Sequence, residues 1–150
     1  MLTTLVAVFL FNSTAFAQQA SRVAQFNTED GIALQGYDPV AYFTQNKAIK
    51  GKKELAVAAE GITYYFATAD DKEIFKKDFK KYEPQYGGWC AYAMGAEGEK
   101  VVIDPETFKI TGGKLYLFYH NWASNTLPKW NKDEANLKSK ADVTWAKFLK

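Results

Sequence analysis

Two sulfur-bearing side chains lie close together in the middle of the chain. Cys90, the only cysteine, precedes Met94 by four residues, and the apolar run 89–94 that contains both is compact enough to start a buried helix. Side chains four positions apart on a helix share one face, so the thiol and the thioether are expected side by side. The positive end of the helix dipole favours thiolate at a cysteine near the helix start. This pair of donors suits a soft metal ion such as Cu(I).

A third donor of matching chemistry is His120, the only histidine, at the end of a predicted strand. Cu(I) accepts two or three ligands, whereas a structural zinc site needs four, which one cysteine and one histidine do not supply. The candidate metal ligands are therefore Cys90, Met94 and His120, with copper as the candidate cofactor. If His120 points away, a dimer that bridges two Cys90 thiolates is the alternative. The competing interpretation is that both sulfurs fill the core and His120 is a surface residue.

Aromatic residues around the Gly87-Gly88 pair indicate a second kind of site. They either form the core or surround a pocket for a small ligand or a protein partner, in which phenol groups orient the ligand. The residues assigned to this candidate ligand pocket are Tyr37, Asp38, Tyr86, Trp89 and Tyr92. A third hypothesis is a thiol enzyme, but only His120 with Asp104 or Asp38 would activate Cys90, and no catalytic motif accompanies them.

The N-terminus predicts export. Residues 1–17 carry no charge, contain an apolar core and end in Ala15-Phe16-Ala17, a pattern typical of a signal-peptidase site. We expect a signal peptide over 1–17, a flexible polar lead-in over 18–29, and one domain over 30–149. Export to the periplasm or the medium then follows, without stable membrane insertion after cleavage. A net charge of +2 and a single arginine disfavour nucleic acid as a partner, and we expect a monomer or weak homodimer that binds a metal ion or small ligand.

The elements that position these residues are short. Two β-hairpins are predicted, one turning at Glu60-Gly61 and one at Gly112-Gly113. Helices are predicted after Asp38-Pro39, after Thr68 or Asp70, after Thr126, and after Asp142, each from its capping residue. Because these elements alternate without a βαβ rhythm, the expected fold is a small α+β domain. Its expected core residues are Phe75, Tyr116, Trp130 and Trp145.

Several ordered segments resemble the exported YHS-domain family. They are 36–43, 64–66, 82–91, 113–117 and 141–145, together with Phe75. The resemblance covers about residues 30–149 and implies a small α+β domain that binds a transition metal, most often copper or another heavy metal.

The sequence departs from that family at the metal ligands. The short metal-binding YHS modules carry three cysteines, and this chain has Ala41, Ala67 and Asp71 at those positions. A histidine at position 120 is likewise particular to this chain, because the family more often has asparagine there. The resemblance therefore implies a metal site only if it is rebuilt around Cys90.

Overall fold

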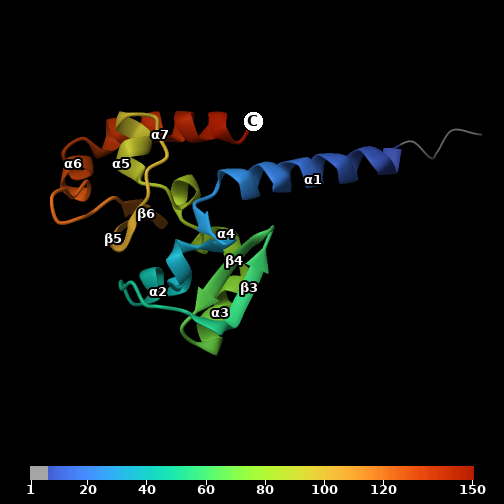
Figure 1. Ribbon diagram of the computed structural model, residues 1–150. Coiled ribbons are helices and arrows are strands. Elements are labelled where there is room, and N and C mark those ends of the chain that lie inside the picture. The colour runs from blue at the N-terminus through green and yellow to red at the C-terminus, as the bar shows by residue number, and fades with distance from the viewer. Residues whose placement is uncertain (1–6) are drawn as a thin grey trace, which may run out of the picture.

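The computed structural model of the protein describes residues 7–150, and side chains from residue 14 onward. The chain forms one α+β domain with two small sheets and several short helices, as the sequence predicts (Figure 1). The elements are α1 (Ala7–Gln25), β1 (Thr28–Glu29), β2 (Ile32–Ala33), η1 (Leu34–Gly36), α2 (Pro39–Thr44), β3 (Lys52–Ala59), β4 (Ile62–Phe66), α3 (Ala69–Lys77), α4 (Phe79–Tyr82), η2 (Gln85–Gly88), α5 (Ala91–Ala96), β5 (Asp104–Thr111), β6 (Lys114–Phe118), α6 (Leu127–Lys132) and α7 (Glu134–Phe148).

Both predicted hairpins are present. β3 and β4 pair antiparallel around Glu60 and Gly61, whose φ angles of 46° and 85° give the left-handed turn that suits a tight hairpin. β4 also pairs with β2, which gives the first sheet the order β1-β2-β4-β3. β5 and β6 form the second sheet around Gly112 and Gly113. These turns depend only on local backbone preferences, which explains why the sequence predicted them.

Two of the predicted helix starts are confirmed by their capping bonds. The Asp38 carboxylate accepts hydrogen bonds from the backbone N–H of Val40 and Ala41 at the start of α2, at 2.8 and 3.3 Å. The Thr68 hydroxyl accepts the N–H of Asp71 at 3.1 Å and caps α3.

The predicted start of the last helix at Asp142 was wrong, because α7 begins at Glu134 and continues through that position. The Asp142 side chain does not cap a helix. It accepts hydrogen bonds from the Tyr86 hydroxyl at 2.9 Å and from Lys138 at 2.7 Å.

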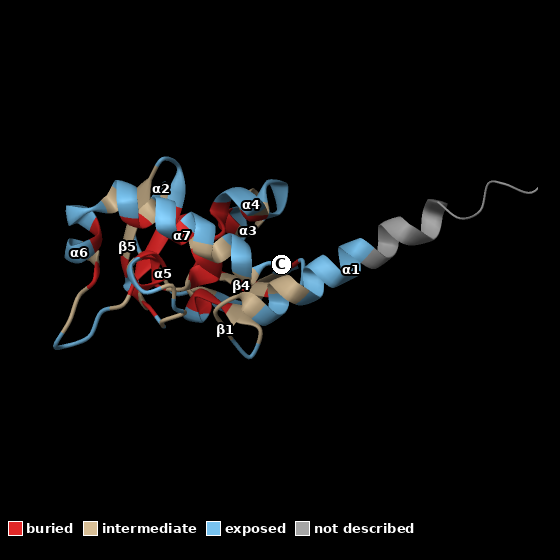
Figure 2. Cartoon of the chain, turned by 90° about the horizontal axis from the view of Figure 1, so that it is seen from above, coloured by how far each residue is buried: buried red, intermediate tan, exposed pale blue. Residues whose placement is uncertain are grey.

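The buried residues lie inside the body of the domain (Figure 2) and form two hydrophobic clusters. The first lies on the larger sheet and includes Phe75, which is fully buried as predicted. The second lies among β6, α5, α6 and α7 and contains Tyr116 and Trp130, both buried as predicted. Trp145 is only partly buried at the edge of this second cluster. It therefore remains available to line a surface cleft.

α1 leaves the body of the domain and projects into solvent (Figure 1). Residues 14–20 are all exposed, and contacts with the body become extensive only from Ser21 onward. Where the sequence predicted a flexible lead-in over 18–29, the chain is helical to Gln25 and then forms β1. Of the predicted signal peptide, residues 1–6 lie outside the described residues. Between residues 7 and 150, no helix is both long and apolar enough to cross a membrane.

Candidate functional site: a cleft between α1 and α7

Cys90 is completely buried. Its Sγ accepts a hydrogen bond from the Tyr119 N–H at 3.3 Å and lies 3.4 Å from the Thr126 hydroxyl. Its own backbone N–H donates to the Val101 carbonyl at 2.9 Å. The thiol is thus buried and hydrogen-bonded to two neighbours, as expected for a cysteine that packs as a small core residue.

Met94 does not join Cys90 on a helix face. α5 begins at Ala91, and Cys90 is the residue before it, with φ −58° and ψ 116° outside the helical region. The rule that places residues four apart on one face therefore does not apply. Cys90 packs in the first core cluster and Met94 in the second, although the Met94 N–H does donate to the Cys90 carbonyl at 3.0 Å.

His120 is partly exposed, with 43% of its side-chain surface accessible. Its Nδ1 lies 2.8 Å from the Thr107 hydroxyl and 3.3 Å from an Asp104 carboxylate oxygen. Within residues 7–150, no hydrogen bond joins His120 to Cys90, and no group of three or more His, Cys, Asp or Glu side chains is arranged to hold a metal ion. The described structure therefore does not bring Cys90, Met94 and His120 together, and copper binding stays a prediction. A hydrogen-bonded pair of Cys90 and His120, which a thiol enzyme would need, is likewise not present among the described residues.

Asp38 is also buried and works as a structural group. Besides capping α2, its carboxylate accepts the Ala67 N–H at 2.7 Å and thus ties α2 to the residue after β4. Burial raises the pKa of Asp38 to about 6, although the three N–H donors oppose this shift, and nearby Asp71 adds to it. A carboxylate with these bonds has no open side for a ligand.

The remaining residues of the predicted pocket are dispersed. The Tyr37 hydroxyl faces Glu106 at 3.4 Å, and the Trp89 indole donates to the Gln25 carbonyl at 2.7 Å. Tyr92 packs against both core clusters. Of the five predicted pocket residues, only Tyr86 lines the main cavity found among the described residues.

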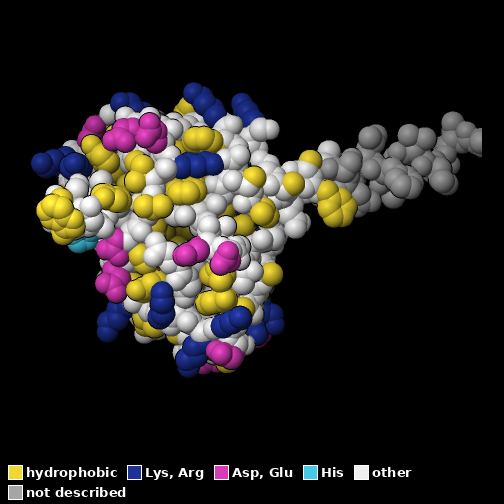
Figure 3. All heavy atoms as spheres, viewed as in Figure 1, with side chains coloured by type: hydrophobic (Ala, Val, Ile, Leu, Met, Phe, Trp, Pro, Cys, Tyr) yellow, Lys and Arg dark blue, Asp and Glu magenta, His cyan; other side chains and the backbone are white. Residues whose placement is uncertain are grey.

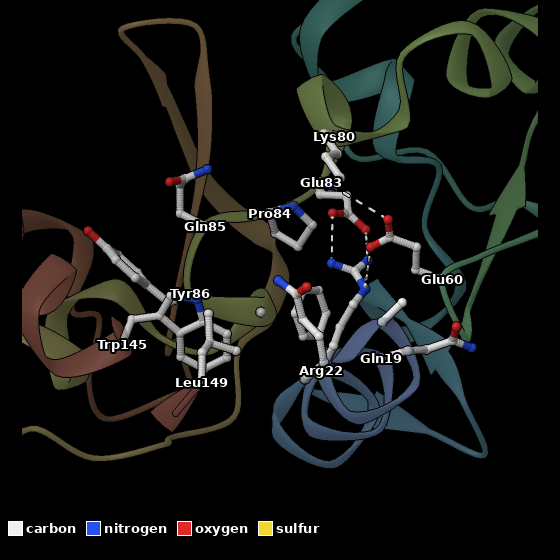
Figure 4. Close-up of a pocket in the computed structure, with 14 residues that line it drawn as sticks. Gln19, Arg22, Glu60, Lys80, Glu83, Pro84, Gln85, Tyr86, Trp145 and Leu149 are labelled. Atoms are coloured by element: carbon white, nitrogen blue, oxygen red, sulfur yellow. Dashed lines mark hydrogen bonds and ion pairs between the residues drawn. The ribbon is translucent and has the colours of Figure 1, made fainter. Parts of the chain in front are cut away.

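That cavity is a cleft of about 480 Å³ between α1, the segment from α4 to η2, and the end of α7 (Figure 4). We call it the α1–α7 cleft. Its volume lies in the range of small-molecule sites. The lining residues are Ala15, Gln18, Gln19, Arg22, Phe26, Glu60, Lys80, Glu83, Pro84, Gln85, Tyr86, Gly87, Trp145 and Leu149.

One wall of the cleft is charged (Figure 4). Arg22, the only arginine of the chain, forms a two-pronged ion pair with Glu83, which is 8% exposed. The Tyr64 hydroxyl donates to the same carboxylate at 2.6 Å. Burial raises the pKa of Tyr64 well above its ordinary value, and adjacent Glu83 raises it further, so this phenol keeps its proton.

Glu60 lies at the outer edge of this wall. It is 3.7 Å from Arg22 and 3.6 Å from Lys80, which are ion-pair distances beyond hydrogen-bond range. Two cations and two carboxylates thus balance at the cleft, while the Glu60 oxygens retain their capacity to accept hydrogen bonds.

The opposite wall is apolar. Trp145 from α7 contacts Phe26 edge to face, with ring centroids 5.9 Å apart. Beneath it, Gly87 has φ +60°, and a Cβ there would lie 2.7 Å from the Trp145 ring. A larger residue at position 87 would therefore strain the backbone and push the Trp145 ring away from this wall. Leu149 continues the apolar surface outward.

Three primary amides line the cleft without a hydrogen-bond partner among the described residues. They are the side chains of Gln18, Gln19 and Gln85. With Glu60, they give the cleft donors and acceptors for a ligand. No sequence motif indicates that Arg22, Glu60 and Glu83 belong to this site. Only the presence of a single arginine in a chain with eighteen lysines sets Arg22 apart.

Comparison with known proteins gives no relative: no family model, no curated protein and no solved structure matches this chain. The resemblance to the YHS-domain family accordingly stays a prediction, and the function rests on the geometry of the site.

Proposed function

We propose that the protein is an exported binding module that holds a small, neutral, amphipathic molecule in the α1–α7 cleft. The observation that carries this proposal is the pairing of an aromatic wall, Trp145 and Phe26, with a charge-balanced wall that keeps unpaired acceptors. An apolar ring is stabilised against the first wall by burial, and a polar substituent by Glu60 and the amides.

Charge balance determines the kind of ligand. Because Arg22 and Lys80 are each paired with Glu83 or Glu60, the side chains that line the cleft carry no surplus charge with which to attract an ion. A charged ligand would also lose hydration that no counter-charge replaces. A neutral molecule with a ring and one or two hydrogen-bonding groups therefore suits the cleft best.

Export is part of the same proposal. The predicted cleavage after Ala17 removes only Ala15 from the residues that line the cleft. Arg22 and Phe26, which join α1 to the body, stay in the processed chain. The intact mass of protein from the producing cell should therefore match a chain that begins at Gln18, and a mass that includes Met1 would contradict export by this route.

The test of the binding site is a titration with two neutral probes, indole-3-acetamide and phenyl glucoside, with indole-3-acetate as the charged comparison. We expect the neutral probes to bind and the acetate to bind more weakly than the acetamide. Leu149→Arg, which puts a cation on the apolar wall, should weaken binding at least about tenfold, equivalent to about 1.4 kcal/mol.

Val143→Arg is the matched control, because Val143 lies on the same helix and is 58% exposed but does not line the cleft. This variant should bind like the parent. Equal loss of affinity in both variants, or no binding of either neutral probe to the parent, would contradict the proposal.

A further inference from the structure

Trp122 is the most exposed large apolar residue described in this chain, with 98% of its surface accessible. Tryptophan is highly buried on average, and Trp130 of the same chain is fully buried. Trp122 lies in the loop between β6 and α6, and none of the core clusters includes it. Packing within the domain therefore does not explain this side chain.

The loop that carries Trp122 is held in one conformation. The Asn121 side-chain carbonyl accepts the N–H groups of Ala123 and Ser124 at 2.9 and 2.8 Å, and the Asn121 N–H donates to the Ser124 carbonyl at 2.9 Å. The Thr126 N–H closes the base of the loop on the Tyr119 carbonyl at 3.0 Å. An aromatic residue presented on an ordered turn loses little conformational entropy when it binds.

This loop and the cleft lie at opposite ends of the molecule. α6 and the loop before it are at one end, and α1 projects from the other (Figure 1). In the space-filling view, hydrophobic side chains project from the surface beside the histidine, on the side of the molecule away from α1 (Figure 3). Trp122 therefore does not reach the cleft of its own chain, whereas it is free to meet the cleft of a second copy.

The chemistry of the two surfaces matches. An indole is a neutral ring with a single N–H donor, which is the kind of ligand that the α1–α7 cleft suits. Its ring would lie against Trp145 and Leu149, and its N–H would donate to Glu60 or to one of the unpaired amides. We propose that Trp122 of one copy inserts into the α1–α7 cleft of another, so that the protein self-associates head to tail; this rests on the proposed function of the cleft.

The positions of Trp122 and the cleft, and the small area of one aromatic side chain, indicate what kind of assembly to expect. Each copy has the projecting residue at one end and the cleft at the other, so a single contact joins two different surfaces and leaves one Trp122 and one cleft free for further copies. One aromatic side chain buries about 150–250 Å², well below the roughly 800 Å² per partner of a stable complex. Association should therefore be weak and should grow with concentration.

The experiment is sedimentation velocity on the full chain as isolated from the cell, from about 10 µM to about 1 mM, a range chosen for weak association. The parent should sediment faster as its concentration rises. Trp122→Ala, which removes the projecting residue, and Leu149→Arg, which blocks the cleft, should each stay monomeric. Val143→Arg should behave like the parent.

Mixing the two monomeric variants provides the decisive test. Trp122→Ala still has an open cleft and Leu149→Arg still has Trp122, so an equimolar mixture should form a dimer and nothing larger. Addition of indole-3-acetamide should dissociate it. A monomeric parent at all concentrations, unchanged association in Trp122→Ala, or a mixture that stays monomeric would each overturn the proposal.

The outcomes separate this inference from the function of the cleft. If the neutral probes bind and the parent stays monomeric, only head-to-tail association fails. If the parent associates through Trp122 and the probes do not bind, the cleft serves self-association and the proposed small-molecule function fails.

Discussion

The Cys90 environment is closed and buried, whereas the α1–α7 cleft is open to solvent. Around Cys90, a segment with a conspicuous sequence pattern is closed by the Tyr119 N–H and the Thr126 hydroxyl. The cleft is built from residues without a motif, contributed by four separate parts of the chain, and it remains open. Residue types with reactive side chains thus pack in the core of the first region, whereas in the second Glu60 and the glutamine side chains keep free hydrogen-bonding groups at an open surface.

The largest expected effect concerns the closed region. Met94 is completely buried, so Met94→Ala should lower the free energy of unfolding by about 3–4 kcal/mol through lost contacts and a cavity. Leu149→Ala in the cleft wall, where the side chain is 41% exposed, should cost less than about 1 kcal/mol. Urea unfolding of both variants measures the difference. Similar losses would mean that the two regions are equally open.

The next effect concerns the charged wall. Arg22→Met leaves the buried Glu83 carboxylate with the Tyr64 hydroxyl as its remaining side-chain donor, and should cost about 2–3 kcal/mol. Lys76→Met is the control, because it breaks an exposed pair with Glu73 at 3.1 Å and should cost less than about 0.5 kcal/mol. If urea unfolding gives the same small loss for both, water already solvates Glu83.

The smallest expected effect is the pH dependence of stability that comes from Asp38. It tests whether Asp38 is a buried capping carboxylate or an open pocket residue. Because the folded pKa of Asp38 is about 6 and its unfolded value is near 3.9, the folded protein binds this proton more strongly. Its contribution to stability is present below about pH 4 and is lost as pH rises through about 6, and the loss between pH 4 and pH 7 is about 2 kcal/mol.

Asp38→Asn removes this titration. The stability of the parent minus that of Asp38→Asn should therefore fall between pH 4 and pH 7, as measured by urea unfolding at each pH. A difference that rises over this interval would mean that the carboxylate is held charged in the folded state.

Local features of this fold were predictable from the sequence. The turn at Glu60-Gly61 and the caps at Asp38 and Thr68 each depend on a few neighbouring residues, and the structure confirms them. The start of α7 was missed because Asp142 resembles a capping residue, whereas tertiary bonds to Tyr86 and Lys138 use its carboxylate inside the helix.

The candidate site was not predictable in the same way. Its ion pair joins Arg22 to Glu83, and its aromatic contact joins Phe26 to Trp145, both across large separations in sequence. No spacing rule connects such residues. The prediction that Cys90 and Met94 share a helix face was wrong for a local reason. α5 starts at Ala91, one residue after Cys90.

We propose that the α1–α7 cleft binds ligands and that the buried Cys90 environment does not. The most direct measurement is a set of ¹H–¹⁵N spectra recorded with indole-3-acetamide and, separately, with Cu(I), because the indole N–H of Trp145 reports on the cleft and that of Trp130 on the closed core. We predict that indole-3-acetamide shifts the Trp145 indole and the Arg22 side-chain signals and leaves Trp130 unchanged. Stoichiometric Cu(I) that shifts the Cys90 and Met94 amides, together with a Trp145 signal that no neutral probe moves, would contradict the account.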